Sequence, residues 1–347
     1  MEKQLINYLM SLMIIATTFG QELDQIKLAN EYYQSKEYDK AGNIYKKLSK
    51  QKRNIPRIHS NYLDLMINNA KLDDAYKYLN YVIKQYPGNS RYHVDQIYVA
   101  HLLPNQKEYK RFKEALYDAS RGNVNTLKRI AEELSQRKLH NDALVFLSQA
   151  RIESQNSKAY ALDFAKNYSM LGNNPKMIAE YVNFASQQAH HIPYIKNILQ
   201  DLLLDESIKE ILEKELITRS QQYPDDGLYN DLLMWLYIQG NNYQGAFVQA
   251  KAIDRNSQRK GSTVMQVAKV AYDNQAYEEA VLFYEYVVTK SGQGPTLEKA
   301  QFLSLLSKEK KLSDKPTIDK QALHQIAAEY QQFYERTTET NPYRLQA

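Results

Sequence analysis

The chain has 347 residues, of which 45 are basic and 40 acidic, so its formal net charge at pH 7 is +5. It contains no cysteine, which excludes disulfides, thiolate metal sites and cysteine nucleophiles. Glycine and proline number only 11 and 9, which favours helices joined by short loops, and the near balance of charge does not indicate a nucleic-acid-binding surface.

The first twenty residues have the organisation of an export signal. An apolar run over residues 8–16 follows a weakly positive start, and Thr18 and Gly20 are small residues at the two positions that a signal peptidase reads. We therefore expect residues 1–20 to be a signal peptide cleaved before Gln21, and the protein to be exported to the periplasm or the periphery of the outer membrane. A glutamine after the cut resembles many envelope proteins of Bacteroidetes-type bacteria.

The same apolar run is too short to cross a bilayer, which takes ~20 apolar residues. No later segment of the sequence is long and apolar enough to cross a bilayer, so we expect no integral membrane span. The alternative is a cytoplasmic protein in which residues 1–20 form an ordinary first helix.

A repeat follows the signal segment. Similar short motifs recur with a small residue at a fixed place, and this small residue serves as an anchor for aligning the copies. Neighbouring anchors are 34 residues apart, with one gap of 35, which gives eight repeats over residues 21–295. The strong anchors are Ala41, Ala75, Ala143, Ala246 and Ala280, and the weaker ones are Tyr109, Met177 and Leu212.

Large apolar residues keep register with the anchors. In most repeats one lies four residues after the anchor and another lies nine residues before it, which places apolar residues on one face of each of two helices. We therefore predict two helices per repeat, joined by a short polar turn. Gly240 is predicted to take the left-handed conformation that ends a helix.

The combination of period, small anchor and aromatic spacing resembles the tetratricopeptide repeat (TPR) family. The resemblance covers about four-fifths of the chain and implies an all-α fold, an α-solenoid of about eight to nine antiparallel helix pairs stacked into a right-handed superhelix. The third repeat, which contains Pro104 and Tyr109, and the sixth repeat, which lacks small residues, depart from the pattern. We expect both to pack irregularly.

After Pro295 the register breaks. Residues 296–347 are predicted to form an irregular ninth repeat, with helices over residues 297–310 and 319–336 and a polar linker between them. Residues 343–347 resemble the start of a further helix. Because a solenoid normally ends in a polar capping element, our hypothesis is that the chain is truncated at Ala347.

Motifs that carry chemistry are missing from the sequence. It contains no glycine-rich phosphate loop, no Gly-x-Ser-x-Gly elbow and no His-Glu-x-x-His. Its paired carboxylates and short basic runs are typical of solvated helix faces. We therefore expect no enzymatic activity, no cofactor, no metal and no nucleic-acid partner.

In the TPR family the first helix of each pair lines a concave groove, and the resemblance assigns residues of this chain to it. Arginine and aromatic side chains in such a groove favour recognition of a protein or peptide. For Trp235 the alternative is a place in the seam between helices, and Ile26 is also assigned to the groove. The partner-binding residues expected are Asn30, Tyr33, Arg57, Asn61, Arg91, Tyr98, Lys128, Tyr194, Trp235, Lys269 and Tyr272.

Some family members clamp a C-terminal carboxylate with asparagine and basic residues. Asn30, Asn61 and Arg91 stand at three of those places. Ile26 and Asp95 stand where basic residues are required, and Asp95 would repel a carboxylate. We therefore do not expect this clamp.

These expectations combine into a non-enzymatic scaffold that binds a protein or peptide through its groove, within a multiprotein complex of the bacterial cell envelope. Two alternatives stay open. One is a structural or assembly subunit that associates with itself. The other is a fragment of a larger TPR protein whose functional domain follows Ala347.

Overall fold

All regular secondary structure is helical in residues 20–104, 106–258, 260–314 and 319–346, which are the residues that the computed structural model describes. The predicted signal peptide therefore lies outside the described residues, except for Gly20. The chain divides after Asn173 into two compact units. We call them the first unit and the second unit and describe each by itself.

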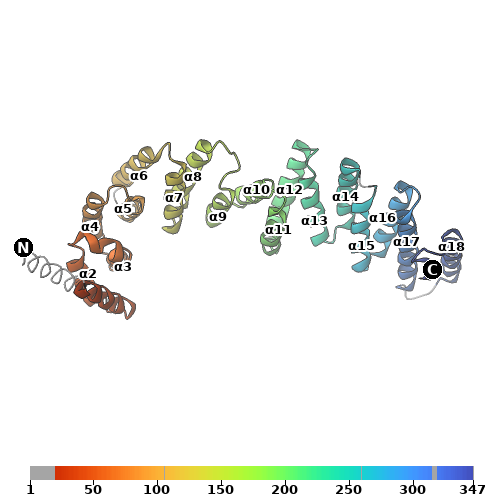
Figure 1. The fold of residues 1–347 in the computed structure, drawn as a ribbon, viewed down its shortest axis with the longest axis horizontal. Coiled ribbons are helices and arrows are strands. Elements are labelled where there is room, and N and C mark those ends of the chain that lie inside the picture. The colour runs from red at the N-terminus through yellow and green to blue at the C-terminus, as the bar shows by residue number, and fades with distance from the viewer. Residues whose placement is uncertain (1–19, 105, 259, 315–318, 347) are drawn as a thin grey trace, which may run out of the picture. The chain divides into compact units, whose positions relative to one another are not determined.

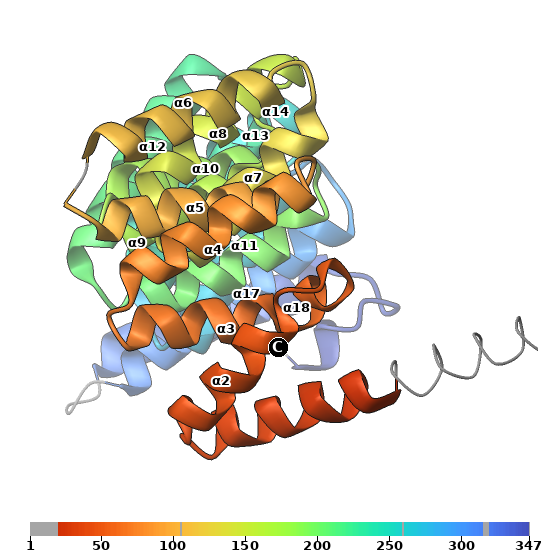
Figure 2. The same cartoon turned by 90° about the vertical axis from the view of Figure 1, so that its left-hand side faces the viewer.

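The first unit begins with a helix over residues 20–34. From α3 on, each helix contacts the one before it, and Figure 2 shows α3, α4 and α5 side by side. The helices are α2 Tyr38–Leu48, α3 Ile55–Asn68, α4 Leu72–Gln85, α5 Ser90–Leu102, α6 Gln106–Ser120, α7 Val124–Gln136, α8 His140–Glu153 and α9 Ala161–Met170, with a 3₁₀ turn η1 at Lys52–Asn54 (Figure 1).

The second unit continues the succession of helices up to the predicted ninth repeat. None of its described helices is long and apolar enough to cross a membrane, and the same holds for the described helices of the first unit. The helices are α10 Asn174–Ala185, α11 His191–Leu202, α12 Glu206–Gln222, α13 Gly227–Gln239, α14 Tyr243–Ser257, α15 Ser262–Asp273, α16 Tyr277–Lys290, α17 Pro295–Ser313 and α18 Lys320–Arg336, with a 3₁₀ turn η2 at Arg344–Gln346.

The small anchors lie where helices meet. All five alanine anchors are 0% exposed, and the weaker anchors Met177 and Leu212 are also buried. A side chain of one carbon lets two helix backbones approach closely. The large apolar residue four positions later lies one turn further along the same helix face and packs beside this contact. Tyr45, Leu79, Leu147, Leu216 and Tyr284, each four residues after its anchor, are buried.

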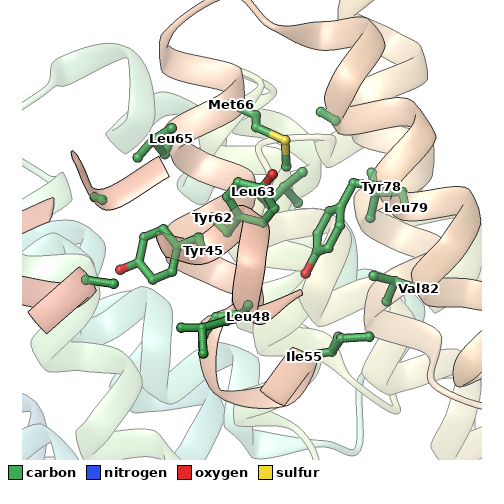
Figure 3. Packing of buried hydrophobic residues seen from close by; sticks show 14 of the residues in the cluster. Tyr45, Leu48, Ile55, Tyr62, Leu63, Leu65, Met66, Tyr78, Leu79 and Val82 are labelled. Atoms are coloured by element: carbon green, nitrogen blue, oxygen red, sulfur yellow. The ribbon is translucent and has the colours of Figure 1, made fainter. Parts of the chain in front are cut away.

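The tyrosines of the first unit serve as packing residues. Figure 3 shows Tyr45, Tyr62 and Tyr78 in succession across α2, α3 and α4, with ring centres 5.8 Å and 5.0 Å apart. Such tilted and edge-on pairs contribute about 0.5–1.5 kcal/mol each beyond the area they bury. Ile26, which the resemblance assigns to the groove, is buried in this same core at 7% exposure. That assignment is wrong because the apolar side chain lies in the core and is not accessible to a partner.

Six of the turns inside helix pairs share one backbone conformation. The residue five positions before the anchor has a positive φ in each: Lys36, Ala70, Lys138, Gly172, Asn241 and Gln275. The next residue donates its N–H to the carbonyl of the residue nine positions before the anchor, as Lys71 does to Met66 at 2.8 Å. This six-to-one bond defines the Schellman motif, which satisfies carbonyls that the helix end leaves unpaired.

The prediction for Gly240 is wrong by one residue. Gly240 is the C-cap of α13, has φ −91° and still donates a helical hydrogen bond from its N–H to the carbonyl of Leu236. The left-handed residue is Asn241, with φ 53°. Asparagine tolerates this conformation because its short polar side chain can bond locally.

The third and sixth pairs differ from the others, as their sequences indicate. In the third, the residue after α5 is Leu103, whose backbone is extended with ψ 151°. In the sixth, Leu203 keeps helical angles and Asp205 caps α12 by accepting a bond from the N–H of Ser207. Helix α12 packs mainly against α10 and α13 instead of α11.

The end of the chain folds back on α17. The Tyr343 ring lies 5.1 Å from the ring of Phe302, and Asn341 accepts a bond from the N–H of Tyr343. In the described part of the predicted further helix, residues 343–346, the structure has one 3₁₀ turn, η2 at Arg344–Gln346. Tyr343 directly precedes this turn, and its stacking on Phe302 holds the turn beside α17.

Candidate functional site

The first unit carries a hollow of about 470 Å³ on α3, α5 and α7, the first helices of three successive pairs. This volume is in the usual range of ligand pockets. Most of the side chains that line it are charged, and we call it the polar hollow. They are Ser60, Asp64, Arg91, Val94, Asp95, Arg129, Glu132, Glu133, Gln136 and Arg137.

Helical spacing brings these side chains to one face. On α5 the lining residues stand at positions 91, 94 and 95, and on α7 at 129, 132, 133 and 136. Residues three and four apart are neighbours on a helix surface. Because α5 and α7 also contact each other, the two faces adjoin.

An arginine and two aspartates from three helix pairs form the floor. Arg137 bonds Asp95 Oδ1 through Nε at 2.7 Å and Asp64 Oδ1 through Nη1 at 3.0 Å. Asp95 is 2% exposed, and its second oxygen lies 2.8 Å from His59 Nε2. The guanidinium also lies 5.1 Å from the ring centre of Tyr98. A buried carboxylate is tolerated here because it is paired on both oxygens.

Further polar side chains hold the rim. Arg91 donates to Ser60 Oγ at 2.8 Å, and Arg129 donates to Ser90 Oγ, which in turn donates to Glu133 at 3.1 Å. Burial raises the pKa of the Glu133 carboxyl, while the bond from Ser90 lowers it by less. A guanidinium has five N–H donors, so both arginines can keep these contacts and also donate to a bound group.

The structure brings some of the predicted partner-binding residues to this place. Arg91 lines the hollow, Tyr98 lies against Arg137, and Lys128 pairs at 2.5 Å with Glu132 of the lining.

Other predicted residues of the first unit are not among the lining residues. Asn30 accepts bonds from Tyr45 and from Asn61, so these two asparagines are engaged with each other. Tyr33 packs near Tyr38, and Arg57 is exposed on α3.

The predicted residues of the second unit do not share one site. Tyr194 is exposed on α11 and Trp235 is half-buried on α13, with the ammonium of Lys196 5.9 Å from its ring. Lys269 is exposed and pairs with Asp273 at 2.5 Å. Tyr272 packs edge-on against Tyr277.

Sequence reasoning missed Arg129, Glu133 and Arg137. They stand four residues apart, which places them on one face of α7 and its C-cap. This spacing is visible in the sequence and could have identified them. The acidic partners of Arg137 could not be found this way, since Asp95 and Asp64 stand 42 and 73 residues earlier in the chain.

The charged side chains that line the polar hollow make it suitable for binding a charged group. Both oxygens of Asp95 are engaged, and the carboxyl of Asp64 is held by Arg137. Among the described residues, no three histidine, aspartate or glutamate side chains gather in a way that could hold a metal ion.

No family model and no curated protein matches the chain. Solved structures of helical-repeat proteins are similar to it at low identity. A tetratricopeptide repeat protein from Parabacteroides merdae is 14% identical, covers 70% of this chain with 94% of its own length, and has a TM-score of 0.24. Yeast Tom70 is 10% identical, covers 94% of each chain, and has a TM-score of 0.26. The pilF protein of Pseudomonas aeruginosa is 13% identical, covers 82% of this chain and 96% of its own, and has a TM-score of 0.19.

At these TM-scores the superpositions carry no argument about this chain. Its architecture follows from its own helices and turns: it is an all-α protein in which, within each of the two units, most helices pack against the helices that precede and follow them in the chain.

Proposed function

We propose that the chain is a non-enzymatic scaffold of the TPR type, and that it binds a segment of a partner protein in the polar hollow. The observation that carries the proposal is the hollow itself, on three successive first helices, which presents Arg91, Arg129 and Glu132 around a floor formed by Arg137 and its two aspartate partners. A polar peptide can form ion pairs there with both the basic and the acidic side chains. Arginine is also enriched in the interfaces that proteins use to bind one another.

The floor supports this function because it is ordered before any partner arrives. Arg137 and His59 both bond Asp95 inside the protein, so a ligand does not have to order these three side chains on binding. Preorganisation of this kind raises affinity by reducing the entropy lost on association.

The test is capture of partners from an extract of the source cells by the immobilised chain, quantified by mass spectrometry. We expect the double variant Arg91→Ala/Arg129→Ala to lose the partner, with affinity reduced about tenfold or more, because truncated interface arginines often cost over 1 kcal/mol each. The matched control is Arg111→Ala, an exposed arginine on the second helix α6. Equal capture by the double variant, with an unchanged circular dichroism spectrum, would refute the proposal.

We also propose that the protein acts in the cell envelope, on the strength of the export signal in residues 1–20. Intact mass and fractionation of the protein from its own host test this. A mature species that starts at Gln21 in the periplasmic or outer-membrane fraction is expected. A cytoplasmic species that retains Met1 would contradict export.

A further inference from the structure

The second unit carries a separate hollow of about 820 Å³, formed by the second helices α14 and α16 and by the connection from α14 to α15. We call it the basic hollow. Four of its lining residues are cations, and several others are apolar. The lining consists of Val248, Lys251, Ala252, Asp254, Arg255, Gln258, Lys260, Gly261, Tyr286 and Lys290.

Two of the cations lie beside aromatic rings, those of Phe247 and Tyr286. The Lys251 ammonium lies 4.3 Å from the ring centre of Phe247 and 5.7 Å from that of Tyr286. Lys290, in the last turn of α16, lies 5.8 Å from the same tyrosine ring. Cations at such distances are attracted to the ring face. Arg255 stands four residues after Lys251 and therefore shares its face of α14.

One carboxylate lies inside the basic hollow, and it offsets only one of the four positive charges. Asp254 is buried and accepts the N–H groups of Thr263 and Val264 at 3.0 Å, at the start of α15. Among the described residues no carboxylate forms an ion pair with any of the four cations. The lining residues of the basic hollow thus carry an excess of three positive charges, in a chain whose total charge is nearly balanced.

We propose that the basic hollow binds an acidic segment of a partner protein. Carboxylates of the segment would pair with Lys251, Arg255 and Lys290, and an apolar side chain would lie on Val248, which is 53% exposed. Charge complementarity carries the choice of an acidic ligand, since opposite potentials steer and orient association. The exposed apolar part of the lining favours a peptide that alternates acidic and apolar residues.

The aromatic ring argues against a nucleic acid as the occupant. Single-stranded nucleic acids bind by stacking their bases on exposed aromatic faces. The Tyr286 ring is half-buried, has two ammonium groups beside it, and contacts Phe247 edge-on at 5.3 Å. It therefore offers no free stacking platform.

The test is fluorescence anisotropy of the full chain with a labelled peptide of alternating glutamate and leucine, next to the same peptide with glutamine for glutamate. The double variant Arg255→Glu/Lys290→Glu removes two attractions and adds two repulsions, so we expect about tenfold or more weaker binding of the glutamate peptide. The matched control is Lys107→Glu/Lys320→Glu, which makes the same change of net charge in the first turns of α6 and α18. It should bind as the parent does, and added salt should weaken the parent's binding.

Three results would overturn the proposal. The parent could bind both peptides alike, or the Arg255→Glu/Lys290→Glu variant could bind the glutamate peptide as tightly as the parent. An oligodeoxythymidine that binds the parent more tightly than the glutamate peptide, and is lost in the same variant, would make the hollow a nucleic-acid site instead.

Discussion

Replacing Ala70 by glycine is expected to stabilise the first unit. Ala70 occupies the left-handed position of the turn between α3 and α4, with φ 56°, and is exposed. An L-residue in this conformation costs roughly 1–2 kcal/mol, whereas glycine adopts it freely. Glycine also loses more backbone freedom on folding, which offsets about 0.5–1 kcal/mol. The net gain in the free energy of unfolding is therefore about 0.5–1 kcal/mol.

Two substitutions in the same unit serve as matched controls. Ala75→Gly makes the same chemical change five residues later, at a fully buried anchor inside α4, where lost helix propensity and a lost methyl contact should destabilise by about 2 kcal/mol. Gly172→Ala reverses the change at the equivalent turn, where φ is 68° and no other atom lies within 4 Å of an added methyl. It should destabilise by about 1 kcal/mol.

The assay is urea unfolding followed by circular dichroism, with the midpoint and slope compared among the three variants and the parent. The reasoning requires Ala70→Gly and Ala75→Gly to shift the midpoint in opposite directions. If Ala70→Gly lowers the midpoint as Ala75→Gly does, the left-handed turn does not strain the chain and the argument fails.

Three further predictions concern single side chains. Gly245→Ala should destabilise the second unit by about 1 kcal/mol in urea, because an added methyl would meet the Tyr237 ring at 2.9 Å and this overpacking outweighs the better helix propensity of alanine. Asp319→Ala should cost about 1 kcal/mol and speed amide hydrogen exchange in the first turn of α18, since Asp319 accepts two backbone N–H groups there. Glu133→Gln should raise stability at pH 7: burial raises the folded pKa of Glu133 above 4.5, so its ionised form is the disfavoured one. The gain should disappear in urea titrations as the pH falls below about 4.5, where both side chains are neutral, and a gain that persists in acid would contradict the assigned cause.

The helix pairs could be predicted because their determinants are local and repeated. A small residue where two helices touch, and a large apolar residue one turn later, impose the same requirement on every copy, so Ala41 and Ala280 can be aligned by eye across the chain. The irregular third and sixth pairs were also accessible, because Pro104 and the missing small residues break that requirement.

The left-handed backbone conformation of the turns could not be predicted from the residue types at these positions. Gly172 is the only glycine among the six, and the others are two lysines, an alanine, an asparagine and a glutamine. Two helices that pack against each other fix the path of the connection, and the six-to-one bond then enforces the conformation whatever the side chain. The prediction at Gly240 failed because it relied on residue type at a place where the packing decides.

The polar hollow shows where a functional residue can be sought in a repeat of this kind. Arg137 occupies the position just before the left-handed residue, and the turn through Lys138 fixes the end of α7 so that the guanidinium reaches Asp95 and Asp64. The other five such turns carry at this position Ser35, Asn69, Leu171, Gly240 and Asn274. The backbone there is common to all six turns, so the fold itself does not require an arginine. A charged side chain is therefore evidence for a site when the residues at the same backbone position of the other turns are uncharged. This comparison among the turns identifies Arg137, which is not one of the predicted groove residues.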